Sequence, residues 1–274
     1  MTLAGDLARA ATWLRDADGL LVAAGAGMGI DSGLPDFRGP GGFWAVYPAL
    51  GQAGIRFETI ASPAAFAANP RLAWGFYGHR LDLYRQTVPH AGFSRLLGMA
   101  AGMAHGPFVF TSNVDGQFQK AGFADDRICE IHGSIHHLQC ATGCGAAIWP
   151  AAGFFPQVDA DACRLAGDLP RGPGCGGLAR PNVLMFGDWD WIEWRTEDQQ
   201  RRLAQWRAAV RHPVCVEVGA GTAIPSVRHF AEHFGGHLIR INPNEPAVPD
   251  PDSSVGLALG GLAGIAALAD AVAA

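Results

Sequence analysis

The sequence predicts an α/β protein in which a doubly wound parallel sheet carries a smaller inserted lobe. The 274 residues are 49% apolar and 16% charged, a composition typical of a globular chain with a large buried core. Short apolar runs of strand length recur along the chain, and helical patterns lie between several of them. Strands that alternate with helices form a parallel sheet covered by helices on both faces.

The first element is an amphipathic helix, because Leu3, Leu7, Ala11 and Leu14 recur at helical spacing. The run LLVAA at 20–24 follows as a short buried strand that ends in glycine. Five later apolar runs are also predicted to be buried strands: PFVFT at 107–111, NVLMF at 182–186, PVCVEV at 213–218, HLIRI at 237–241 and VGLAL at 255–259.

Two helices are predicted toward the C-terminus. One spans 196–211, where Thr196 and Gln199 have the spacing of a capping box. The other is the Ala/Leu-rich segment 262–274.

Two stretches break the alternation of strands and helices. Residues 44–85 are aromatic and helical, whereas residues 135–179 are rich in Gly, Pro and Cys and show no strong period. We interpret them as a helical module and a Cys-rich module that together form the small lobe. The large domain then comprises residues 1–43, 86–134 and 180–274.

Charge and hydropathy exclude several classes of protein. The net charge is −5 and no basic stripe is present, so we expect no nucleic-acid partner. No run of 18 apolar residues occurs, so we expect no membrane span. Asp6, Arg9 and Arg15 interrupt the N-terminal apolar pattern, which argues against a signal peptide and predicts a cytoplasmic protein. In that compartment the six cysteines are expected to be ligands or free thiols.

The first strand runs into the glycine-rich stretch GAGMGIDSGLPDFRG at 25–39. Gly25 and Gly27 fit the phosphate-binding pattern Gly-x-Gly-x-x-Gly of a Rossmann-like sheet, but Ile30 stands at the third position. No acidic residue follows about twenty positions later, as hydride-transferring enzymes usually require. The glycines alone therefore indicate either a nucleotide loop or a tight turn after a strand.

Six stretches of the chain resemble, in the same order, the motifs of the sirtuins, the NAD-dependent protein deacylases. They are GAG with SGLPDFR within 25–38, TSNVDG at 111–116, IHGS at 131–134, RPNVLMFGD at 180–188, VGAGT at 218–222 and IN at 241–242. The resemblance covers residues 20–265 almost from end to end. It implies a protein-lysine deacylase that acts as a deacetylase, a desuccinylase or a demalonylase. Such an enzyme releases nicotinamide and O-acyl-ADP-ribose, and its substrates are proteins with acylated lysines.

The resemblance also implies the residues of the NAD pocket. Asn113 and Asp115 would hold the nicotinamide carboxamide and a structural water, and Phe37 would shield the reactive ribose carbon from water. The full predicted set is Gly25, Ala26, Gly27, Asp36, Phe37, Arg38, Ser112, Asn113, Asp115, Gly219, Gly221, Thr222 and Asn242.

The resemblance implies that His132 is the general base, which takes a proton from a ribose hydroxyl. Imidazole suits this step because its pKa lies near neutral pH. Phe186, Gly187 and Asp188 would flank a groove in which the substrate peptide binds as an extra strand.

Tyr77 and Arg80 match the Tyr-x-x-Arg pair of the sirtuin branch that removes succinyl and malonyl groups. The spacing of three places both on one helix face, where a guanidinium could pair with an acyl carboxylate. The alternative is an ordinary aromatic helix with a solvated arginine.

Cys140, Cys144, Cys163 and Cys175 suggest a structural Cys₄ zinc site. The family pattern is two Cys pairs, and Gly172 stands where a third ligand is expected. Either Cys163 substitutes for that ligand or the site has lost its metal. Cys129 and Cys215 lie in strand-like runs and are expected to be core thiols.

The chain departs from the family pattern at Gly29, Ser112 and the Ala220–Gly221 turn, all near the NAD pocket. Protein ADP-ribosyl transfer and NAD hydrolysis therefore stay open as alternatives, since both also begin with loss of nicotinamide. A non-catalytic NAD sensor is the second alternative, and the presence of His132, Asn113 and Asp115 argues against it.

Overall fold

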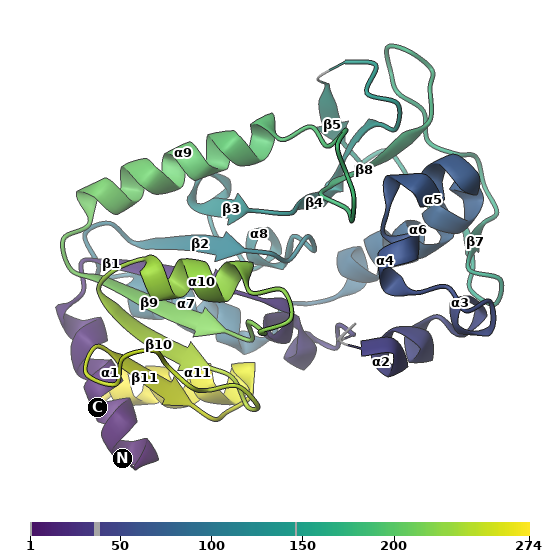
Figure 1. Ribbon diagram of the computed structural model, residues 1–274. Helices are drawn as coiled ribbons and strands as arrows, with labels where there is room; N and C mark the ends of the chain where they lie inside the picture. Colours follow the sequence, from purple (N-terminus) through teal and green to yellow (C-terminus); the bar gives the residue numbers. More distant parts are fainter. Residues whose placement is uncertain (1, 36–38, 146) are drawn as a thin grey trace.

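The protein is described from a computed structural model, which covers residues 2–35, 39–145 and 147–274. Its centre is a six-stranded sheet in the order β11-β10-β9-β1-β2-β3, with every pair parallel. The doubly wound α/β prediction is thus confirmed (Figure 1). The strands are β1 (Gly19–Ala24), β2 (Pro107–Thr111), β3 (Ile128–Glu130), β9 (Pro213–Val218), β10 (His237–Ile241) and β11 (Ser254–Leu257).

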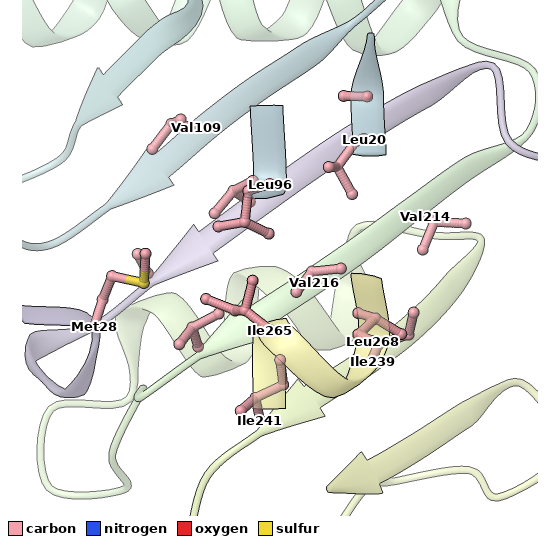
Figure 2. Packing of buried hydrophobic residues seen from close by; sticks show 14 of the residues in the cluster. Leu20, Met28, Leu96, Val109, Val214, Val216, Ile239, Ile241, Ile265 and Leu268 are labelled. Carbon is pink, nitrogen blue, oxygen red and sulfur yellow. The ribbon is translucent and has the colours of Figure 1, made fainter. Parts of the chain in front are cut away.

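Helices cover both faces of this sheet because its strands are apolar on both sides. Leu20 and Val22 of β1 pack with α1 (Leu3–Asp16), α7 (Ala91–Ala100) and α11 (Gly261–Ala273). Figure 2 shows part of this cluster, with Leu20 of β1, Leu96 of α7, and Ile265 and Leu268 of α11 labelled. The alternate residues Leu21 and Ala23 pack with α9 (Trp194–Ala209) and α10 (Ser226–His233) on the other face. Every residue of β1 is buried, as expected for a central parallel strand.

Two predictions about individual elements are wrong. The run at 182–186 is not a strand of the main sheet, because β8 (Ala179–Val183) pairs with β4 (Gly133–Cys140) in a separate antiparallel sheet. Thr196 and Gln199 do not form a capping box, since α9 begins at Trp194. Instead, the Thr196 hydroxyl donates to the Glu130 carbonyl, and the Gln199 side chain accepts from the Glu130 N–H.

The small lobe has one hydrophobic core built from two distant segments of the chain. Phe66, Trp74 and Tyr77 from the first segment pack in the same cluster as Ile135 and Leu138 from the second. The first segment forms α2 (Gly39–Val46), α3 (Pro48–Gln52), α4 (Phe57–Ile60), α5 (Pro63–Ala68) and α6 (Pro70–Gln86). The second forms β4, β5 (Ile148–Pro150), β6 (Val158–Asp159), β7 (Arg164–Leu165) and β8.

Three short elements complete the chain: the 3₁₀ helices η1 (Ala26–Ser32) and η2 (Asp125–Arg127) and the helix α8 (Gln117–Lys120). Within the described ranges, no helix is long and apolar enough to cross a lipid bilayer.

Candidate active site

The loops that follow β1 and β9 meet at the carboxyl edge of the sheet, where ligands of open α/β sheets bind. The Gly27 N–H donates to the Gly219 carbonyl at 3.1 Å, and the Gly25 N–H donates to the Val218 carbonyl at 3.0 Å. A Cβ on Gly27 would lie 2.6 Å from the Gly219 Cα, so neither loop has room for a side chain at this contact. Gly219 also has a left-handed φ of 62°, which favours glycine.

Two asparagine side chains link these loops to their neighbours. Asn113, which follows β2, donates its amide to the Gly25 carbonyl at 3.0 Å. Asn242, which follows β10, donates its amide to the Ala220 carbonyl at 2.9 Å and is 1% exposed. The carboxyl ends of four neighbouring strands are therefore held together by hydrogen bonds.

The remaining residues of the predicted NAD pocket have different environments. Ala26 is exposed, and the Ser112 N–H donates to the Ala24 carbonyl. Thr222 donates its N–H and its hydroxyl to the Glu245 carboxylate, while Gly221 beside it is half-buried. Asp36, Phe37 and Arg38 lie outside the described residues. Sequence reasoning missed Glu245, because no spacing connects it with a turn 23 residues away.

Asp115 is a buried carboxylate near the same edge. Burial raises its pKa from the usual 3.8 to about 6, and the nearby Glu130 carboxylate acts in the same direction. The Gln117 N–H donates to Asp115 Oδ1 at 2.9 Å and opposes this shift. The His136 Nε2 lies 2.8 Å from the Asp115 carbonyl oxygen and so holds the backbone of this segment.

His132 lies in the turn after β3, next to the segment that follows β2. Its carbonyl accepts from the Leu184 N–H at 2.9 Å, which ties the turn to the chain after β8. Partial burial lowers the pKa of the His132 imidazole below 6.5, and a hydrogen bond to the Ser112 backbone opposes this shift. An imidazole in this environment is neutral at neutral pH and can accept a proton.

The three residues predicted to flank the substrate groove differ in exposure and in backbone conformation. Phe186 is 41% exposed, and Gly187 has a left-handed φ of 65°. The Asp188 carboxylate is fully buried and accepts two 2.8 Å hydrogen bonds from Arg180, so only the Asp188 backbone is left to face a peptide in the predicted groove. Asp188 also accepts from the Met185 N–H, so its side chain fixes the loop rather than lining the groove.

Tyr77 and Arg80 lie on one face of α6, as their spacing predicts. The Arg80 guanidinium lies 5.9 Å from the Tyr77 ring centroid and 5.2 Å from that of Phe76. Arg80 Nε and Nη2 both donate to the Tyr84 hydroxyl, at 2.9 and 2.6 Å. Arg80 is 9% exposed and Tyr77 is 1% exposed, so the alternative of a solvated arginine is wrong. Tyr84 was missed, although its i,i+4 spacing from Arg80 was a usable signal.

Three of the four predicted metal ligands form one group. Cys140, Cys144 and Cys175 bring their sulfurs within 4.8 Å of one another, a set that could hold a zinc ion. The alternative in which Cys163 substitutes for the missing ligand is wrong, because Cys163 is buried in the core of the small lobe. Cys129 and Cys215 are buried in the main sheet, as predicted.

A cavity of about 640 Å³ lies beside the Asp115–Gly116 segment. Tyr84, Ser134, His136 and Arg195 contribute to its wall together with Gly116, whereas Gly25, Gly27 and Gly219 are not among its lining residues. The cavity is therefore separate from the carboxyl edge where Asn113 meets Gly25.

Comparison with known proteins agrees with this architecture. Residues 25–202 match the model of the Sir2 family. An NAD-dependent protein deacylase of Methylococcus capsulatus is 31% identical over 258 residues, which cover 92% of this chain and 90% of that protein. NAD-dependent protein deacylase 2 of Pyrobaculum aerophilum is 33% identical, covering 86% and 83%. The mitochondrial sirtuin-5 of Canis lupus familiaris is 34% identical, covering 62% and 56%.

A solved structure described as a Sir2 homolog–NAD complex has the same fold. Its TM-score is 0.72, and the match covers 97% of this chain and 93% of that chain at 24% sequence identity.

Proposed function

The chain belongs to the Sir2 family, and from this premise we propose that it is an NAD-dependent protein deacylase. Such an enzyme moves an acyl group from a lysine side chain to the ADP-ribose part of NAD and releases nicotinamide. The observation that carries the proposal is the proximity of the two strand ends that bear Asn113 and His132. Asn113 contacts the glycine loop after β1, and the His132 side chain contacts the Ser112 backbone.

We propose that NAD binds along the carboxyl edge formed by the loops after β1, β2, β9 and β10. The glycines let the loops after β1 and β9 pack backbone against backbone there, as in the tight glycine turns beside which a pyrophosphate binds. Asn113 and Asp115 would orient the nicotinamide amide, and Asn242 would fix the loop that faces the adenosine. Bound NAD supplies the ribose carbon that receives the acyl oxygen as nicotinamide leaves.

His132 is proposed as the general base of the reaction. Its neutral imidazole would accept a proton from a ribose hydroxyl, and that hydroxyl oxygen then attacks the acyl carbon. The pKa of His132 is lowered by burial, so the imidazole is ready to accept a proton throughout the neutral range. The substrate peptide is proposed to run past Phe186 and Ile224, two exposed apolar side chains on the loops that follow β8 and β9.

We further propose that the acyl group reaches α6 of the small lobe and that Arg80 recognises an acidic acyl chain. The guanidinium lies among the rings of Phe76, Tyr77 and Tyr84, so water screens its charge weakly. A charge-assisted hydrogen bond contributes roughly 1.5–3 kcal/mol, which predicts about a tenfold to hundredfold preference for succinyl or malonyl over acetyl.

The first experiment incubates the protein with NAD and matched acetyl-, succinyl- and malonyl-lysine peptides. Nicotinamide, free lysine peptide and O-acyl-ADP-ribose should form in equal amounts. His132→Ala should lower turnover by on the order of 10² to 10⁴ while NAD still binds, because the base acts after binding. Nicotinamide release without loss of the acyl group would instead favour NAD hydrolysis, and label transfer from NAD to protein would favour ADP-ribosyl transfer. If NAD binds but no product of any kind forms, the non-catalytic NAD sensor is favoured.

The second experiment tests the acyl preference with Arg80→Met. This change should remove most of the preference for acidic acyl groups and leave deacetylation little changed. Arg71→Met is the matched control on the same helix, because the Arg71 guanidinium binds backbone carbonyls at 165–167. If acetyl is preferred in the wild type, or if Arg80→Met lowers both activities equally, the pair has only a structural role.

A further inference from the structure

The Cys-rich module contains a group of three cysteine thiols, one fewer than the four ligands of a closed tetrahedral metal site. Cys140 ends β4, Cys144 follows it in a loop, and Cys175 lies in the tight turn at 172–177. The sulfurs of Cys140 and Cys175 are 3.3 Å apart. In a tetrahedral zinc–thiolate centre the sulfurs are about 3.8 Å apart, so a small adjustment of these side chains would accommodate an ion.

The donor set suits a thiophilic divalent metal. Three sulfurs converge, and the Gly177 N–H donates to the Cys175 sulfur at 3.3 Å, a contact that stabilises a thiolate. Within the described residues, no other His, Cys, Asp or Glu joins the group. Cys163 stays in the core of the small lobe, where its carbonyl oxygen lies 2.0 Å from the position that a Cβ on Gly75 would take.

Gly172 lies at the missing corner. A Cβ built on this buried glycine would lie 2.8 Å from the Cys140 sulfur and 2.9 Å from the Cys175 sulfur. The turn holds it there, because its N–H donates to the Gly177 carbonyl and its carbonyl accepts from the Gly176 N–H. Both distances are shorter than a Cβ normally keeps, so the two sulfurs would have to move apart to admit a side chain here. Gly172 therefore lies next to the thiols but supplies no fourth ligand.

We infer that Cys140, Cys144 and Cys175 bind a divalent metal through three thiolates and that the fourth coordination position, beside Gly172, takes a small monodentate ligand from solution. Each thiol loses its proton on binding, so three protons are released per ion. Sites with three protein ligands keep a water or another small molecule in the open position, whereas closed Cys₄ sites do not. Cys144 and Cys175 are exposed, which gives such a ligand access.

The test uses Co²⁺, whose visible absorption reports its ligands, in the full-length protein reconstituted under reducing conditions. One Co²⁺ per chain should bind. Titration with imidazole should change the absorption bands while the metal content stays constant. Gly172→Cys should abolish this response and tighten Co²⁺ binding at least about tenfold, since even loss of an outer contact of a metal site changes affinity by that much.

Gly174→Cys is the matched control, because it adds a thiol to the same turn at a position where a Cβ has no neighbour within 4 Å. It should keep the imidazole response of the wild type. The inference is overturned if the wild type binds no Co²⁺, or if its absorption bands do not change with imidazole. It is also overturned if the bands of Gly172→Cys change with imidazole as those of the wild type do. The wild-type titration decides the question even if Gly172→Cys fails to fold, and none of these readouts depends on deacylase activity.

Discussion

Replacing Asp188 with asparagine should destabilise the protein strongly, although the two side chains are nearly equal in size. Arg180 and Asp188 are both fully buried and form two hydrogen bonds of 2.8 Å. Asparagine keeps the shape but turns one acceptor into a donor, so an Arg180 N–H or the Met185 N–H meets an NH₂ group. Among the described residues the Arg180 Nε has no hydrogen-bond partner, so loss of a bond at Asp188 would leave the guanidinium with a second unsatisfied N–H group.

The expected loss follows from leaving a buried charge without its partner, which costs about 3–5 kcal/mol. For a chain of this size, each kcal/mol lowers Tm by about 2–4 °C, so Tm should fall by roughly 6–20 °C in a calorimetric or circular dichroism scan. Replacing both partners, as Arg180→Met with Asp188→Leu, should recover part of the loss because no unpaired charge then remains buried.

Asp198→Asn provides the comparison, since Asp198 also pairs with two arginines but is 43% exposed. Water screens these ion pairs, so the Tm of the Asp198→Asn variant should differ little from that of the wild type. If Asp188→Asn lowers Tm no more than Asp198→Asn does, burial of the Arg180–Asp188 pair is not what stabilises the loop after β8.

Three further outcomes are expected. Asp115→Asn should stabilise the protein by roughly 3 kcal/mol at pH 8, because burial raises the pKa of Asp115 from 3.8 to about 6 and the folded state favours its neutral form. In urea titrations this gain in stability should shrink as the pH falls through 6 and vanish near 4. An equal gain at every pH would contradict the raised pKa of Asp115. The acid limb of kcat/KM should lie below pH 6.5, since burial lowers the pKa of His132, and an inflection above 6.5 would exclude His132 as the base. Gly27→Ala should cost about 1–3 kcal/mol by urea unfolding, because its Cβ meets the Gly219 backbone at 2.6 Å, whereas Gly98→Ala, with open space around it, should cost nothing.

The main sheet could be predicted because its signal is local. The runs at 107–111, 213–218 and 237–241 coincide with β2, β9 and β10, since a central parallel strand buries nearly every side chain and so appears as a mainly apolar run. Glu217 of β9 and Arg240 of β10 are the charged exceptions, and they form a buried ion pair with each other. β8 could not be predicted in the same way, because its buried Arg180 and Asn182 have partners elsewhere in the chain. Only the tertiary fold supplies those partners.

For the candidate site, the sequence indicated which residues to consider but not all of their contacts. Motif order identified Asn113 and His132 without any structural information, and their neighbourhood follows from adjacent parallel strands. The role of Asp188 and the position of Cys163 depend on which side of a loop faces the core. Sequence spacing carries no information about that choice, so the Cys163 prediction needed correction and the burial of the Asp188 carboxylate was not foreseen.

The shared core of the small lobe has a consequence for synthesis on the ribosome. The α2–α6 segment, which ends at Gln86, buries its aromatic side chains against residues of β4 and β8, and β8 ends only at Val183. At about 5–20 residues per second, the helical segment waits roughly 5–20 seconds for the strands that cover it. During that interval its apolar face is open to chaperones and to other nascent chains. The small lobe should therefore gain protease resistance only after β8 has left the exit tunnel, later than its position near the N-terminus suggests.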